Sequence, residues 1–175
     1  MAVLLLADVN EGQLATDAVA KTLAAVKPLG EVHVLVAGMG GDSAAAEAAT
    51  LQGVTKVLFA GDHVYCHGMA EPTAALIAGL AGPYSHVVAP STAFSKSVLP
   101  RVAALLDVMV ISEVLAVHGP DSFDRPIYAG NAIQTVKSSD ATKVMTVRTA
   151  TFEAAGKGGS AAVEKVSASV DGSMS

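Results

Sequence analysis

Tryptophan is absent from this 175-residue sequence, and other aromatic side chains are few, with four Phe and three Tyr. The sequence therefore offers few flat rings on which the bases of a nucleic acid could stack. Basic residues are also scarce, because 11 Lys and Arg stand against 16 Asp and Glu, for a formal net charge of −5. Both shortages argue against a protein that binds the phosphate backbone of nucleic acids.

Cysteine occurs once, at Cys66, so the chain can form neither an internal disulfide nor a thiolate-rich zinc cluster. Long apolar runs are missing as well, and no run reaches the roughly 20 residues that a membrane-spanning helix needs. Residues 1–8 lack the basic flank and the cleavage site of a signal peptide. We expect a cytoplasmic protein without membrane insertion.

Ala and Val, by contrast, are plentiful, and they occur in short apolar runs separated by helical patterns. Apolar runs, typical of strands buried on both faces, occur at residues 3–7, 57–60, 87–89 and 108–111, and at residues 32–37 with His33 as the one polar residue. Spacing of three and four residues predicts helices over 14–26, 42–53, 97–106 and from Glu71. The alternation predicts a three-layer α/β fold, a mostly parallel sheet with helices on both faces.

Local signals predict where two of these helices begin. Asp42 or Ser43 would be the N-cap of the second helix, because their side-chain oxygens can accept a hydrogen bond from a free backbone N–H. Pro100 would lie in the first turn of the helix over 97–106, where a missing N–H costs nothing.

This alternation ends after Glu113. Four strand-like runs follow without a helix between them, at residues 114–117, 125–129, 132–137 and 143–147. Gly130 and Asn131 tolerate positive φ, so they predict a tight reversal. We expect an added antiparallel β segment after residue 113, or an extension of the sheet edge.

The composition changes again at residue 154, where Gly, Ser, Ala, Lys and Glu become dominant. Such a segment has too little apolar surface to bury for its own ordering. We therefore expect one domain over residues 1–153 and a flexible linker or tail over residues 154–175.

Three glycines, Gly38, Gly40 and Gly41, follow a predicted strand and precede a predicted helix. A dinucleotide-binding fingerprint would follow the first strand and would have its third glycine where Ser43 stands. We interpret the glycines as an ordinary turn between a strand and a helix.

A metal-like spacing occurs at His63, Cys66 and His67, which could hold zinc with an open coordination position. No further cysteine lies nearby, so we interpret them as solvated loop residues, and we interpret His33 and His86 as framework residues. We predict no metal site and, without a nucleophile-elbow sequence, no catalytic residue.

The loop over residues 91–97, STAFSKS, would lie at the carboxyl edge of the sheet, where open α/β sheets bind ligands. Its hydroxyls, its lysine and the following helix N-terminus could hold a phosphate or a carboxylate. The simpler interpretation, which we prefer, is a Ser-capped start of a helix.

Several stretches go beyond generic patterning. They are VLVAG at 34–38, LPRVAA at 99–104, ISEV at 111–114, RPIYAGNA at 125–132, TVK at 135–137, VRT at 147–149 and FEAA at 152–155. In this order and spacing they resemble the N-terminal domain of the electron transfer flavoprotein alpha subunit. The resemblance covers residues 1–155, and YAGN at 128–131 is its most specific part.

The resemblance implies a fold like that of the adenine nucleotide alpha hydrolases and a heterodimer with a beta subunit. In that family one FAD carries electrons from acyl-CoA and other dehydrogenases, as in fatty acid beta-oxidation, to a membrane quinone oxidoreductase. An AMP lies in the beta subunit. The chain would thus be part of an electron carrier rather than a catalyst.

The family's FAD is held by a C-terminal domain of the alpha subunit, whose Gly-Gln-Thr-Gly and Ile-Ser-Gly-Ala motifs have no counterpart here. We therefore assign no cofactor-binding residue to this chain, and we expect a shortened, cleaved or split subunit that carries no FAD. The alternative is a free-standing adenine-nucleotide-binding α/β domain that uses the 91–97 loop. A zinc hydrolase is a more remote alternative.

Overall fold

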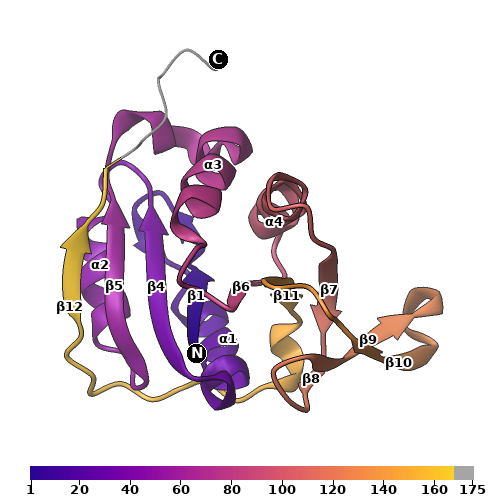
Figure 1. The fold of residues 1–175 in the computed structure, drawn as a ribbon. Coiled ribbons are helices and arrows are strands. Elements are labelled where there is room, and N and C mark those ends of the chain that lie inside the picture. Colours follow the sequence, from indigo (N-terminus) through magenta and orange to yellow (C-terminus); the bar gives the residue numbers. More distant parts are fainter. Residues whose placement is uncertain (168–175) are drawn as a thin grey trace.

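The computed structural model describes residues 1–167, and its centre is a seven-stranded sheet in the order β12–β5–β4–β1–β6–β11–β7 (Figure 1). These strands are β1 Ala2–Leu6, β4 Glu31–Ala37, β5 Val54–Ala60, β6 His86–Pro90, β7 Val110–Val114, β11 Lys143–Val147 and β12 Ala162–Lys165. Every pair of neighbours in this sheet is parallel. The predicted parallel α/β sheet is confirmed.

Within the described residues, four α-helices cover the two faces of the sheet. They are α1 Thr16–Val26, α2 Asp42–Ala49, α3 Ala70–Leu80 and α4 Ala93–Leu105. Successive side chains of β1 enter opposite cores: Val3 and Leu5 pack with α1 and α2, whereas Leu4 and Leu6 pack with α3 and α4. Because helices cover the sheet on both sides, both faces of each central strand are buried. The three-layer arrangement therefore requires strands that are apolar almost continuously.

An antiparallel arm projects from one end of this body (Figure 1). It consists of β8 Ala116–Val117, β9 Ser122–Ile127 and β10 Ala132–Lys137, in the order β10–β9–β8. We call residues 116–137 the arm. A short 3₁₀ turn, Tyr128–Gly130, joins β9 to β10. It makes the tight reversal that the sequence predicted at Gly130 and Asn131. Positive φ falls on Tyr128, Ala129 and Gly130, whereas Asn131 is right-handed.

The fourth strand-like run after Glu113 does not belong to the antiparallel segment. It forms β11, which lies inside the parallel sheet between β6 and β7. Val144, Met145 and Val147 are fully buried there. The arm is therefore an excursion between two neighbouring parallel strands.

Two predicted helix starts are wrong. Helix α4 begins at Ala93, with Thr92 as an N-cap that accepts a hydrogen bond from the Ser95 N–H, so Pro100 lies in the helix interior. Helix α2 has Gly41 as its N-cap, without a side-chain cap from Asp42 or Ser43, and it ends at Ala49. Short polar residues indicate roughly where a helix begins, but they do not identify its first residue.

Residues 152–161 form a strap along the face that carries α1 and α2, and the strap leads into β12. The strap binds the end of α2 through its backbone: Gly158 N and Gly159 N both donate to Thr50 O, at 2.9 and 2.8 Å, and Ala161 N donates to Ala49 O at 3.0 Å. These bonds satisfy helix-end carbonyls that lack intrahelical partners.

The expectation of a flexible segment from residue 154 onward is therefore wrong for residues 154–165. Composition predicted little apolar burial, but backbone hydrogen bonds order the segment instead. Val166 N also donates to Phe59 O at 2.8 Å, and the last part of the expected tail, residues 168–175, lies outside the described residues. The placement of a domain boundary at residue 153 stays a prediction.

Two strands of two residues, β2 Val9–Asn10 and β3 Gln13–Leu14, form a small hairpin directly after β1. The sequence analysis predicted no strand between its strand over residues 3–7 and its helix over residues 14–26. Among residues 1–167, no helix has the combined length and apolarity that crossing a bilayer requires.

Candidate functional site

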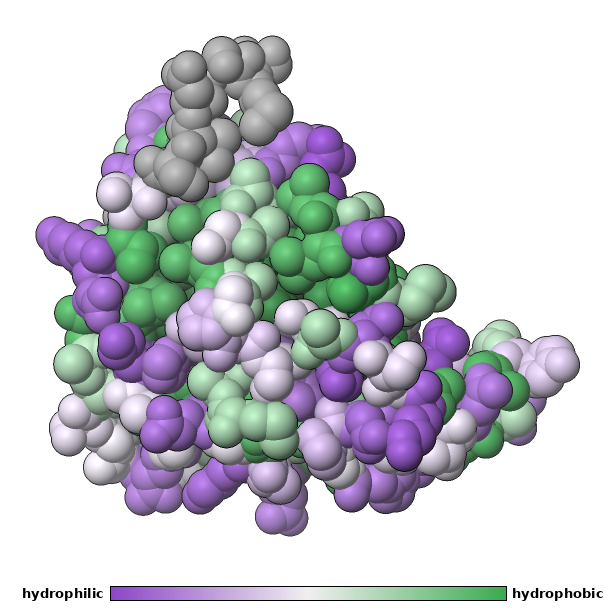
Figure 2. Space-filling view, in the orientation of Figure 1, coloured by the Kyte–Doolittle hydropathy of each residue, from purple (hydrophilic) through white to green (hydrophobic). Residues whose placement is uncertain are grey.

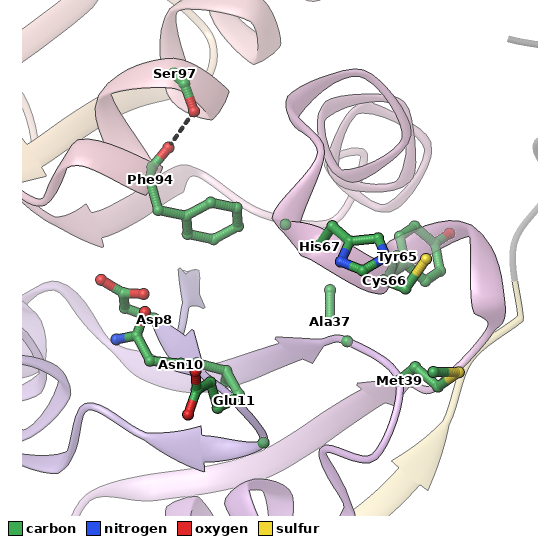
Figure 3. A pocket seen from close by; sticks show the side chains of 14 residues that line it. Asp8, Asn10, Glu11, Ala37, Met39, Tyr65, Cys66, His67, Phe94 and Ser97 are labelled. Atoms are coloured by element: carbon green, nitrogen blue, oxygen red, sulfur yellow. Dashed lines mark hydrogen bonds between the residues drawn. The ribbon is translucent and has the colours of Figure 1, made fainter. Parts of the chain in front are cut away.

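A cavity of about 740 Å³ opens at the carboxyl edge of the parallel sheet (Figure 3). Its wall comes from residues 8–12 after β1, residues 37–39 after β4, residues 65–68, and Phe94 and Ser97 of α4. Strand β1 leads through α1 to β4 on one side, whereas β6 leads through α4 to β7 on the other. The cavity therefore lies at the topological switch point, where open α/β sheets bind ligands.

The cavity wall carries negative rather than positive charge. Asp8 and Glu11 line it, and none of the described residues around it is Lys or Arg. Asp8 is only 6% exposed, and its backbone carbonyl accepts a hydrogen bond from Ala15 N at 2.9 Å. Within residues 1–167 its carboxylate has neither a hydrogen bond nor an ion pair. Such a wall disfavours a phosphate group.

The turn with Gly38, Gly40 and Gly41 joins β4 to α2, as the sequence interpretation has it. Gly38 N donates to Ala60 O at 3.0 Å, and Gly41 N donates to Gly38 O at 3.3 Å. The Gly38 N–H thus bonds to the end of β5 and the Gly41 N–H closes the turn, so neither is available to a dinucleotide.

The residues with metal-like spacing lie in a 3₁₀ segment, His63–Gly68. Cys66 Sγ is 4.0 Å from His63 Nδ1, and His67 and Cys66 line the cavity. The described part of the chain contains no group of three or more His, Cys, Asp or Glu side chains arranged to hold a metal ion.

The polar groups of the 91–97 loop bind one another and a neighbouring strand. Thr92 caps α4, and Ser97 Oγ donates to Phe94 O at 2.6 Å. Lys96 Nζ lies 2.6 Å from Glu113 Oε1, and Ser91 Oγ donates to the same carboxylate. These residues therefore form the start of a helix, as we preferred, but Thr92 rather than a serine is its N-cap, and the lysine already has a partner.

Glu113, which the sequence interpretation missed, is the centre of this network. It has a φ of +60° on β7, and Arg148 Nε lies 4.0 Å from its Oε2. Burial alone would raise the pKa of the Glu113 carboxyl. Hydrogen bonds from Lys96 and Ser91, with the charges of Lys96 and Arg148, outweigh burial and lower that pKa below its usual range.

The two framework histidines are both held by hydrogen bonds. His86 is 1% exposed, its Nε2 lies 2.8 Å from Pro120 O, and its Nδ1 lies 2.8 Å from Ser85 Oγ. Because a carbonyl only accepts, Nε2 carries the proton and donates to Pro120. His33 Nδ1 lies 2.7 Å from the Tyr84 hydroxyl. Burial lowers the pKa of both imidazoles.

The arm exposes large apolar side chains. Tyr128 at its tip is 80% exposed, and Ile133 on β10 is 66% exposed. Figure 2 shows apolar surface on the protruding arm and also over the region of α3 and α4. The base of the arm is fixed, because Phe123 is fully buried in the core that contains α1. The arm is thus a projection that is anchored at its base by a buried side chain and that carries exposed apolar side chains at its end.

Known proteins match the chain along nearly its whole length. The family model of the electron transfer flavoprotein domain matches residues 3–171. The electron transfer flavoprotein subunit alpha of Paracoccus denitrificans is 61% identical over 175 residues, which is 100% of this chain and 57% of that protein. The subunit of the same name from Pseudomonas aeruginosa is 54% identical over 177 residues, with 100% and 57% coverage.

A more distant relative comes from Caenorhabditis elegans. Its probable electron transfer flavoprotein subunit alpha, mitochondrial, is 41% identical over 163 residues, which is 92% of this chain and 49% of that protein. The chain thus spans 49–57% of the length of these curated relatives.

Proposed function

This chain belongs to the electron transfer flavoprotein family, and we propose that it is the N-terminal scaffold and subunit-docking part of an alpha subunit. The match of the family model over residues 3–171 carries the proposal. In this role the chain supports an electron carrier and is not itself a catalyst. Bacterial relatives, from Paracoccus denitrificans and Pseudomonas aeruginosa, support a bacterial source, and we propose that the protein acts in the cytoplasm.

The cofactor of the proposed complex is FAD, which supplies electron transfer when bound. The cavity at the switch point does not fit this group, because its described wall carries Asp8 and Glu11 and no basic side chain to meet a diphosphate. We therefore assign the flavin to parts of the complex outside this chain, and AMP to the beta subunit. Electrons would come from acyl-CoA and other dehydrogenases and pass to a membrane quinone oxidoreductase.

The arm is the docking element that we propose for the beta subunit. Its end is apolar and exposed, whereas its base is anchored by buried Phe123. Ile127 pairs with Ala132 across the arm, and Pro126 pairs with Ile133. Pro126 is tolerated because it lies where β9 has β10 on one side only. Apolar side chains on a rigid projection favour contact with another protein.

Co-expression with the beta subunit tests this assignment. Ile127→Asp and Ile133→Asp should each abolish the heterodimer in size-exclusion chromatography, because a charge would be buried without a partner. Leu105→Asp is the matched control: Leu105 is 56% exposed on α4, outside the arm, and its replacement should leave assembly intact. Assembly that survives both arm substitutions would contradict the docking role, and failure of the unaltered chain to bind any beta subunit would contradict the proposed function.

The alternative function, an adenine-nucleotide-binding domain, has no supporting observation. In its 91–97 segment, Lys96 and Ser91 already bind the Glu113 carboxylate. The wall of the neighbouring cavity is acidic. A thermal shift with AMP or ATP tests it directly. A nucleotide at 100 times its dissociation constant would add about 2.7 kcal/mol to the free energy of unfolding, and we expect no such shift.

A further inference from the structure

Asp8 occupies an unusual position for a carboxylate. It lies two residues after the end of β1 and is 6% exposed, yet no described residue donates a hydrogen bond to its side chain or forms an ion pair with it. Burying a carboxylate without a partner is costly, and buried charges are normally paired. The cost is reduced here because the carboxylate faces the cavity at the switch point.

The cavity offers more than one negative group. Glu11, at a φ of +51° in the tight hairpin between β2 and β3, also lines it, together with the amide of Asn10. In Figure 3 the Phe94 ring projects from α4 into the space between Asp8 and His67. An aromatic face beside carboxylates suits a cation, because the ring quadrupole and the carboxylates both attract positive charge.

We propose that this cavity binds a small organic cation, an ammonium or amidinium group on an apolar body. The positive group would pair with Asp8, and the apolar body would lie against Phe94. A volume of about 740 Å³ falls within the range of roughly 300–1,000 Å³ that is typical of small-molecule sites. This volume exceeds what one inserted lysine or arginine side chain would fill, so it favours a free ligand over a docked side chain.

Three ligands with the same ring and different charge test the proposal. The probes are phenethylammonium, neutral 2-phenylethanol and anionic 3-phenylpropionate, each titrated into the ¹⁵N-labelled chain. Phenethylammonium should shift the amide resonances of residues 8–12, 37–39 and 65–68 and of Phe94 and Ser97, which line the cavity. 2-Phenylethanol should bind more weakly, and 3-phenylpropionate should not bind there.

Asp8→Asn isolates the charge with a nearly unchanged shape. It should weaken the binding of phenethylammonium by about tenfold or more, because a charge-assisted hydrogen bond is lost. The affinity for 2-phenylethanol should stay unchanged. Asp17→Asn is the matched control, since the Asp17 carboxylate is exposed and pairs with Lys21 on α1. Phe94→Leu should weaken the binding of both phenethylammonium and 2-phenylethanol. It serves as a second variant if Asp8→Asn does not fold.

Several outcomes would overturn the proposal. They are no binding of phenethylammonium, equal binding of 3-phenylpropionate, or an Asp8→Asn variant that binds the amine as tightly as the original chain. AMP or MgCl₂ that shifted the same resonances at lower concentration than the amine would also overturn it. None of these results bears on assembly with a beta subunit, so the test is separate from that of the proposed function.

Discussion

At the scale of single residues, His86 ties the body of the protein to the base of the arm. Its imidazole is held between Ser85 and the carbonyl of Pro120, and burial lowers its pKa. The folded state therefore holds the neutral form, whereas the unfolded state takes up a proton at higher pH. The stability that results is complete above the ordinary histidine pKa of about 6.5 and is lost as pH falls below it.

We expect the free energy of unfolding to fall between pH 7 and pH 5, by up to about 1.4 kcal/mol per pH unit for a single histidine. His86→Gln should remove part of this dependence in urea titrations at several pH values. Burial lowers the pKa of His33 in the same direction, and His33 is only partly buried, so His33→Gln should remove a smaller part. A double variant that keeps the full pH dependence would refute the assignment.

The sequence carried a usable signal for only some of these residues. Asp8 directly follows a buried strand, a place where side chains at the carboxyl edge meet ligands, so the cavity could have been anticipated. Glu113 offered no such signal. Its partners Lys96 and Arg148 lie on other elements, and only the folded sheet brings the three together.

At the scale of elements, α4 ends in a helix-terminating motif that depends on Asp107. Val108 N donates to Ala103 O at 3.0 Å and Asp107 N donates to Ala104 O at 3.3 Å, while Asp107 has a φ of +55°. These two bonds define a Schellman motif, whose left-handed position favours glycine.

Asp107→Gly should therefore raise the free energy of unfolding by roughly 0.5–1 kcal/mol, because glycine adopts positive φ without a steric cost. Chemical denaturation measures the change. Asp107→Ala is the matched control, and it should give no gain, since it keeps the Cβ. Equal stability of the two variants would show that the left-handed backbone costs little at this position.

The sequence predicted which segments form strands and helices better than it predicted which elements lie beside one another. The strand-like stretch at residues 143–147, KVMTV, indicates a strand, but it does not indicate between which strands it lies. For the same reason β11 was expected in the antiparallel segment. Strand β12 was missed because all four of its residues are exposed and its order comes from backbone pairing with β5, which composition cannot reveal.

At the scale of the whole molecule, the strap and β12 join elements that are far apart in the sequence. A chain that ends at residue 153 lacks the pairing of β12 with β5 and the bonds from Gly158, Gly159 and Ala161 to the end of α2. We expect this chain to be less stable by about 3 kcal/mol or more, at roughly 0.5–1.5 kcal/mol for each hydrogen bond.

A chain that ends at residue 167 is the control for this deletion, because it keeps the whole strap and β12. Urea titration of both chains compares their stability, and light scattering detects association through the uncovered edge of β5. A chain ending at residue 153 with unchanged stability would support the predicted domain boundary and would show that the strap contributes little.

The strap also determines how the molecule would respond to a mechanical load. Because β12 runs parallel to β5, β4 and β1, Ala2 lies at the end of the sheet where these strands begin, and Lys165 lies at the end where they finish. A pull between these two residues would act along the strands and would load three ladders of hydrogen bonds in shear at the same time. A pull across the strands would open the bonds one after another, so the domain should resist tension along the sheet best.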